Sequence, residues 1–279
     1  MRNMKWLLCA VVLLPLTFPL EAQTKGTVSF SGLKDLEFVD NYYNGGMGSQ
    51  GSGPGKNYQL VFTTNAQAIV SATKGGSGNF VNNPGGSPVM FFATGTNVTI
   101  NATAGIDTAI WLSYSALQPG TATVYDGPNG TGNILASATL TPNNVGCNSY
   151  KMCVWSPVGF PLSATVASIR FTGTANLLGI GAIHVGTKIP TSIALTSSKN
   201  PSAQGEAVTF TANVSANGTA PVGSVTFKTG NTVAGTVPVV GGVAAITLSN
   251  LPVGSTKITA TFNGVDFGVK SASVTQTVN

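Results

Sequence analysis

Three carboxylates near the start of the chain are the first candidates for chemistry. Asp35, Glu37 and Asp40 lie together in the stretch GLKDLEFVDNYYN. In an extended segment Asp35 and Glu37 point to one side of the strand, and a bend would bring Asp40 beside them. With backbone carbonyls these three side chains could bind calcium, which takes roughly six to eight oxygen ligands. The alternative is a solvated loop whose charges keep an exposed strand from pairing with another chain.

Catalysis has little material to draw on. A glycoside hydrolase needs one protonated carboxyl opposite a second carboxyl across a cleft, and the whole chain has only 8 Asp and Glu. The single histidine, His184, stands in the apolar run IGAIHVG and is expected to be a satisfied strand residue. No serine occupies a G-x-S-x-G elbow. We therefore expect no catalytic residue and no enzyme, with glycoside hydrolysis as the least favoured alternative.

Aromatic side chains are the second group with a chemical use, because the faces of sugar rings stack on exposed tyrosine and tryptophan. Tyr42 and Tyr43 precede a glycine-rich run, and Trp155 stands two residues before a proline. We expect all three at the surface and predict them as glycan-stacking residues. Trp111 lies within the apolar run AIWLSYSAL and is expected in the core.

Two cysteines, Cys147 and Cys153, enclose the short segment NSYKM. Their spacing is too long for a C-x-x-C redox motif, and two thiols without a neighbouring histidine make an incomplete zinc site. In an oxidising compartment such a pair predicts a disulfide. Apart from the calcium alternative, we expect no cofactor.

The N-terminus predicts export. Arg2 and Lys5 precede an apolar run that ends at Leu20, and the small residue Ala22 follows. This pattern is typical of a signal peptide, here residues 1–22. The run is short for a bilayer and no comparable run follows it. We therefore expect a secreted or cell-surface protein with no membrane span in the mature chain.

Composition predicts an all-β protein. Only 8% of the residues are charged, whereas 42% are hydrophobic. Thr, Ser, Asn, Gly and Val take the places that Glu, Lys and Arg occupy on helix surfaces, and these residues favour strands and turns. The formal net charge is +5, but the basic residues are scattered singly, so we expect no nucleic-acid partner.

Short apolar or alternating runs divide the chain into two tandem β-sandwiches. Such runs recur through residues 23–187 and predict a first sandwich, in which the glycine-rich residues 45–55 form a surface loop. Pro190 interrupts the pattern. Seven further runs in residues 188–279 match an immunoglobulin-like sandwich in number and size.

Two resemblances refine this picture. The motifs GSVTF and LPVGSTKITATFNG resemble the bacterial Ig-like repeat domains of exported proteins, which implies a spacer or adhesive module without chemistry. The motifs NYYNGG, VYDGPNGTGNILAS and FTGTANLLGIGAIHVG resemble the exported jelly-roll-type domains of PEP-CTERM-associated proteins. That family has little assigned biochemistry, so the resemblance implies a jelly-roll-like fold and export.

The function predicted from these features is an exported, non-catalytic structural or interaction protein, adhesive or displayed at the cell surface. The alternative is a carbohydrate-binding first domain. Extracellular glycans or surface proteins are the expected partners.

Overall fold

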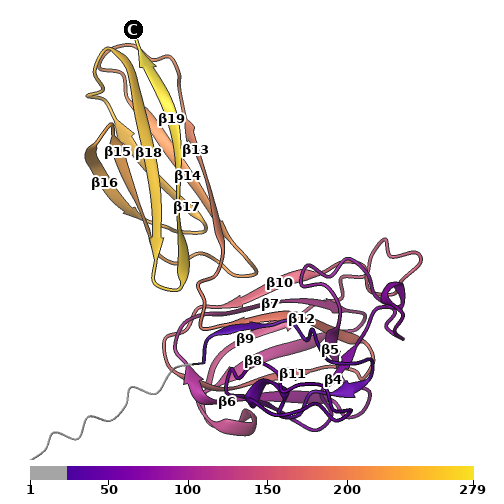
Figure 1. Ribbon diagram of the computed structural model, residues 1–279. Coiled ribbons are helices and arrows are strands. Elements are labelled where there is room, and N and C mark those ends of the chain that lie inside the picture. Colours follow the sequence, from indigo (N-terminus) through magenta and orange to yellow (C-terminus); the bar gives the residue numbers. More distant parts are fainter. Residues whose placement is uncertain (1–23) are drawn as a thin grey trace, which may run out of the picture.

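The computed structural model describes residues 24–279, so the predicted signal peptide lies outside the described part of the chain. Two β-sandwiches follow one another along the chain (Figure 1), and the predicted fold class is confirmed. The first is jelly-roll-like and the second immunoglobulin-like. Within residues 24–279, no helix has the length and apolar character needed to cross a membrane.

The first sandwich consists of two antiparallel sheets. The seven-stranded sheet has the order β10-β7-β12-β5-β4-β2, and β1 pairs with β12 outside this path. Its strands are β1 (Gly26–Val28), β2 (Glu37–Phe38), β4 (Gln67–Ile69), β5 (Val89–Phe91), β7 (Ile110–Ala116), β10 (Ser156–Phe160) and β12 (Leu178–Val185). The five-stranded sheet has the order β3-β6-β11-β8-β9. Its strands are β3 (Leu60–Phe62), β6 (Asn97–Ile106), β8 (Gly120–Tyr125), β9 (Ile134–Leu140) and β11 (Val166–Thr172).

The connections of this sandwich cross repeatedly between its two sheets, as in a jelly roll. The chain leaves the five-stranded sheet after β6, enters the seven-stranded sheet at β7 and returns at β8. It crosses again at β10, β11 and β12. Three short 3-10 helices lie in the loops, at Tyr42–Asn44, Ala72–Lys74 and Pro128–Gly130.

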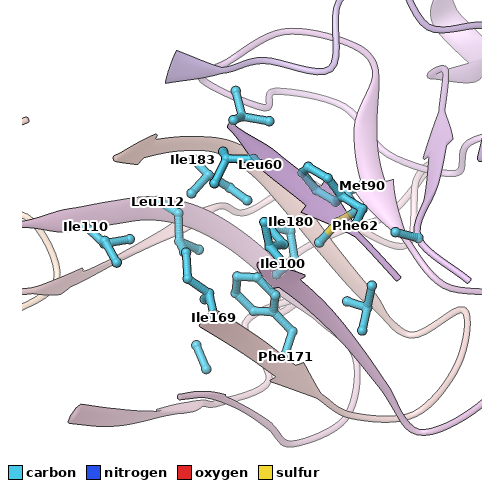
Figure 2. Close-up of a cluster of buried hydrophobic side chains, with 14 of the residues drawn as sticks. Leu60, Phe62, Met90, Ile100, Ile110, Leu112, Ile169, Phe171, Ile180 and Ile183 are labelled. Atoms are coloured by element: carbon cyan, nitrogen blue, oxygen red, sulfur yellow. The ribbon is translucent and has the colours of Figure 1, made fainter. Parts of the chain in front are cut away.

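Alternation of side chains along the strands builds the core between the two sheets. In β7, Ile110, Leu112 and Tyr114 are buried, whereas Trp111 and Ser113 between them point to the other face. Figure 2 shows the resulting cluster, to which both sheets contribute; it includes Leu60, Phe62, Met90, Ile100, Ile110, Leu112, Ile169, Phe171, Ile180 and Ile183. Full burial of one such side chain stabilises the fold by about 1.5–3 kcal/mol.

The second sandwich has a three-stranded and a four-stranded sheet. The first has the order β13-β14-β17 and the second β16-β15-β18-β19. Their strands are β13 (Thr191–Ser197), β14 (Val208–Ala216), β15 (Ser224–Thr229), β16 (Thr232–Pro238), β17 (Val243–Leu248), β18 (Gly254–Gly264) and β19 (Phe267–Val278). Fully buried aromatic side chains form much of the core, namely Phe210, Phe227, Phe262 and Phe267.

The two sandwiches are in direct contact, and the second stands on the side of the first that carries β10 and β7 (Figure 1). β12 ends at Val185 and β13 begins at Thr191, and the predicted domain boundary falls between them. Ile189, in this connection, is fully buried in the core of the second sandwich. Across the junction the Leu162 N–H donates to Asp266 Oδ2 at 3.2 Å.

Candidate functional site

The predicted disulfide is confirmed, because Cys147 and Cys153 are bonded to each other. The loop that they close directs Met152 inward. Met152 is buried with Phe80 and Val89 in a small apolar cluster, against which Trp155 packs. The disulfide therefore supports the segment that carries Trp155.

The prediction that Tyr42 and Tyr43 offer exposed rings for sugar stacking is wrong. They are only 8% and 4% exposed and belong to the main core of the first sandwich. Their rings meet edge to face at 5.0 Å, and the Tyr43 ring also stacks on Tyr58 at 6.0 Å. The short helix at Tyr42–Asn44 turns both rings inward, which a reading of NYYNGG as a polar loop does not foresee.

The three predicted calcium ligands do not form a common site. In residues 24–279, no group of three or more His, Cys, Asp or Glu side chains is arranged to hold a metal ion. Asp35 uses both carboxylate oxygens to accept backbone N–H groups, from Val70 at 2.8 Å and from Ser77 at 2.9 Å. Burial raises the pKa of Asp40. The predicted site at Asp35, Glu37 and Asp40 is therefore not formed.

Glu37 has a structural role instead. Its side chain is 0% exposed and lies under the glycine-rich loop. Oε1 accepts the N–H groups of Gln50 at 2.8 Å and Ser52 at 3.1 Å, and Oε2 accepts Lys34 N–H at 2.7 Å and Ser52 Oγ–H at 2.5 Å. Burial pushes the pKa of Glu37 upward, but these hydrogen bonds together hold the pKa below its usual value.

A groove on the outer face of the seven-stranded sheet is the best candidate for a binding site. Its volume is about 460 Å³, within the range of roughly 300–1,000 Å³ that is common for ligand sites. It is lined by apolar and polar residues without Asp, Glu, Lys or Arg: Thr27, Ser29, Pro84, Gly85, Trp111, Leu112, Ser113, Trp155, Pro157, Ala182, His184 and Asn217. Trp155 is thus the one predicted stacking residue that lines this groove.

A row of paired residues crosses the sheet at one end of the groove. Thr27 of β1 is opposite His184 of β12, and His184 is opposite Trp111 of β7. The rings of His184 and Trp111 are stacked, with centroids 3.5 Å apart and planes within 3°. His184 Nδ1 is 2.9 Å from Thr27 Oγ1, and Trp111 Nε1 donates to Thr187 Oγ1 at 3.2 Å. These bonds fix both rings.

Trp155 is held at a second position beside β12. Its Nε1 donates to the Val81 carbonyl at 2.8 Å, and its ring meets Phe80 edge to face at 5.9 Å. A side chain at Gly179 would lie 3.3 Å from the Trp155 ring. From Gly179 to His184 the strand advances about 16 Å at its usual rise per residue. The two tryptophans therefore lie at different levels along β12.

The floor between them is made of small residues. Gly181 has no side chain, and a Cβ there would collide with Ser113 Oγ and Asn83 Oδ1. The missing side chain allows the Ser113 hydroxyl to donate to Asn83 Oδ1 at 3.3 Å across the strand. Asn83 Nδ2 in turn donates to the Gly86 carbonyl at 2.6 Å. The floor thus presents ordered uncharged polar groups.

None of the described residues that line the groove is Asp, Glu, Lys or Arg. The titratable group in the lining is His184, and burial lowers its pKa, which favours a neutral imidazole at neutral pH. The chemistry that this surface offers is stacking on the Trp155 indole ring, apolar contact with the Trp111–His184 stack, and hydrogen bonding to hydroxyl, amide and imidazole groups.

The sequence did not predict most of the groove residues, although the alternation of apolar and other residues along the strands indicates some of them. In AIWLSYSAL the apolar residues Ile110 and Leu112 alternate with Trp111 and Ser113, and that period of two turns Trp111 and Ser113 away from the core. Trp111 therefore lies outside the core of the first sandwich, but it is half-buried and packs against the core of the second. His184 obeys the same alternation, between the buried residues Ile183 and Val185. No local signal indicates that Asn217, from the second sandwich, reaches this groove.

Comparison with known proteins assigns the second sandwich to a family. Residues 195–279 match the bacterial Ig-like domain (group 3). The second sandwich is a bacterial Ig-like domain. No curated protein matches the chain, and the resemblance of the first half to PEP-CTERM-associated proteins stays a prediction.

Solved structures show only a distant likeness. The glycoside hydrolase domain of Endo-D from Streptococcus pneumoniae R6 aligns with a TM-score of 0.30 and 10% identity, over 78% of this chain and 37% of that one. Fibronectin(III)-like modules of Clostridium thermocellum CbhA align with a TM-score of 0.29 and 16% identity, over 66% of this chain and 86% of that one. The chain thus spans little more than a third of the length of the hydrolase domain. Likeness at this level carries no argument about function.

Proposed function

We propose that this chain is an exported, non-catalytic binding protein whose first sandwich holds a neutral glycan in the groove on its seven-stranded sheet. One observation carries the proposal. Trp111 and Trp155 lie at two levels of a groove whose lining contains no Asp, Glu, Lys or Arg.

The lining matches the two kinds of surface that a sugar presents. The C–H face of a sugar ring is apolar and packs against an indole ring, which supplies a large and rigid contact. The hydroxyl groups at the ring edge need partners for hydrogen bonds, and Ser29, Ser113 and His184 are suitably polar lining residues. An anionic ligand would find no Lys or Arg among these residues, and a cationic one no carboxylate. The ligand is therefore an uncharged saccharide.

The absence of carboxylates from the groove lining also supports binding without turnover. Glycoside hydrolysis requires two carboxyl groups on opposite sides of the scissile bond, and the described residues that line the groove include neither Asp nor Glu. His184 would be the sole acid or base, and its Nδ1 is already engaged with Thr27 Oγ1. In this proposal, glycoside hydrolysis is the least favoured alternative.

An extracellular, adhesive role fits the rest of the molecule. The bacterial Ig-like domain and the Cys147–Cys153 disulfide support a location outside the cytoplasm. The predicted signal peptide agrees with this location. In this proposal the protein attaches to glycans at a surface or in a matrix.

A glycan array tests the proposal. The chain without residues 1–22 is applied to a panel of neutral and acidic glycans, with and without EDTA. We expect neutral glycans to bind, with no effect of EDTA, and Trp155→Ala to weaken binding about tenfold or more because a stacking platform is lost. Trp155→Phe should restore part of the affinity.

The matched control is Tyr125→Ala, which removes a half-buried aromatic ring from β8 of the other sheet and should leave binding unchanged. If no neutral glycan binds, or if Trp155→Ala binds as tightly as the unaltered chain while remaining folded, the proposal fails.

A further inference from the structure

One turn of the Ig-like domain lies directly on the first sandwich beside the groove. The turn at residues 217–219 rests on β10, where the Gly159 N–H donates to the Gly218 carbonyl at 3.3 Å. A Cβ at Gly159 would lie 2.7 Å from the Asn217 carbonyl oxygen, and one at Gly218 would collide with the backbone of Val158 and Pro157. The two backbones therefore touch, with glycine on both sides of the contact.

This contact closes the groove on one side. Gly159 is opposite Trp111 in the sheet, so it continues the row Thr27, His184, Trp111 toward β10. The turn covers this last position. At the other end of the row, Thr27 is exposed and belongs to β1, which pairs with β12 alone. At this end of the groove, the row is thus open past Thr27 and covered beyond Trp111.

The geometry points to a site that receives the end of a neutral glycan chain rather than its interior, with Asn217 of the Ig-like domain as a specificity-determining contact for the terminal sugar. This inference rests on the proposed function, and it gives the Ig-like domain a part in recognition. A polysaccharide threaded along the row would have to pass through the turn at residues 217–219. A chain end can stop against it.

Asn217 is well suited to this contact. Its backbone is fixed, since its N–H donates to the Pro190 carbonyl at 3.2 Å and its own carbonyl lies over Gly159. The residue is exposed and lines the groove. Its side-chain amide can both donate and accept hydrogen bonds, which suits the additional hydroxyl that a terminal sugar carries in place of a glycosidic bond.

Calorimetry on the chain without residues 1–22 tests the inference. The probes are matched pairs of a hexasaccharide and a polymer with the same backbone: cellohexaose with hydroxyethyl cellulose, xylohexaose with xylan, and mannohexaose with mannan. For the backbone that binds, we expect about one protein per chain for both members of the pair, because each chain offers one suitable end. Asn217→Ala should weaken binding about three- to tenfold, the usual effect of losing one hydrogen bond.

The matched control is Asn213→Ala, an exposed asparagine of β14 in the same domain, which should leave affinity unchanged. Several proteins bound along one polymer chain would overturn the inference, and so would unchanged affinity in Asn217→Ala. In either case loss of binding in Trp155→Ala would leave the proposed function standing. If none of the probes binds the unaltered chain at millimolar concentration, the proposed function fails and this inference fails with it.

Discussion

Replacing Glu37 with glutamine is expected to destabilise the first sandwich by about 2–4 kcal/mol. The carboxylate is fully buried and accepts four hydrogen bonds, two at each oxygen. In Glu37→Gln the carbonyl oxygen can keep the bonds from the N–H groups of Gln50 and Ser52. The amide nitrogen, however, then faces the Lys34 N–H, so two donors meet at a buried side chain and neither has an acceptor there. An unmet buried donor costs about 1–3 kcal/mol, and loss of the charge weakens the bonds that remain.

The pH dependence follows from the lowered pKa of Glu37. A carboxyl whose pKa is lower in the folded than in the unfolded chain stabilises the fold above its unfolded pKa, roughly 4.3. That contribution falls as the pH drops from there through the folded pKa, since the folded state must then take up a proton. We therefore expect the difference between the unaltered chain and Glu37→Gln to be full at pH 7 and to shrink in acid.

Urea unfolding followed by tryptophan fluorescence measures this effect selectively. In the chain without residues 1–22, the two tryptophans are Trp111 and Trp155. Trp111 also packs against the core of the Ig-like domain, whereas Trp155 packs within the first sandwich, so the measurement is made in a Trp111→Phe background in which Trp155 alone reports. Glu206→Gln, which removes the ion pair with Lys199 in the Ig-like domain, should leave this transition where it is. A shift below about 0.5 kcal/mol for Glu37→Gln, or a difference that does not change with pH, would refute the reasoning.

Three other perturbations have defined outcomes. Replacing Cys147 and Cys153 together by serine should lower the free energy of unfolding of the first sandwich by about 2–4 kcal/mol. It should also weaken glycan binding, because Trp155 packs on the cluster that the disulfide loop supports. Equal glycan affinity in calorimetry would contradict this prediction. Gly159→Ala should destabilise the junction between the two sandwiches by about 1–3 kcal/mol. Two results together would count against the contact: the same domain arrangement in X-ray scattering and the same stability in calorimetry. Calcium or EDTA should leave the melting temperature unchanged; a rise of several degrees with calcium would restore a metal site near Glu37.

The architecture was predictable from the sequence because it depends on repeated local patterns. Scarcity of charge and alternation of apolar residues indicate sheets wherever they occur, and seven such runs after Pro190 are enough to suggest an Ig-like sandwich. The disulfide was predictable for a similar reason, since Cys147 and Cys153 are close in the sequence.

The candidate site was not predictable in this way, because it is assembled from strands distant in the sequence. Trp111 and His184, which stack on each other, are 73 positions apart in the sequence (184 minus 111). Asn217 reaches the groove from another domain. The inward turn of Tyr42 and Tyr43 depends on a 3-10 helix that composition does not reveal. The sequence suggested that Glu37 binds a cation, because it does not show which groups donate hydrogen bonds to this carboxylate. Three of the four donors are backbone N–H groups, which no residue type reveals.

Tryptophan emission during a titration with a neutral oligosaccharide tests the central claim most directly. The ligand is the one that the glycan array identifies, and binding is measured in parallel by calorimetry. Because Trp111 and Trp155 both line the groove, we predict a saturable change in emission with the same affinity as the heat of binding, and a smaller change in Trp155→Phe. A saccharide that binds in the calorimeter without altering the emission would contradict the account, since it would have to bind elsewhere.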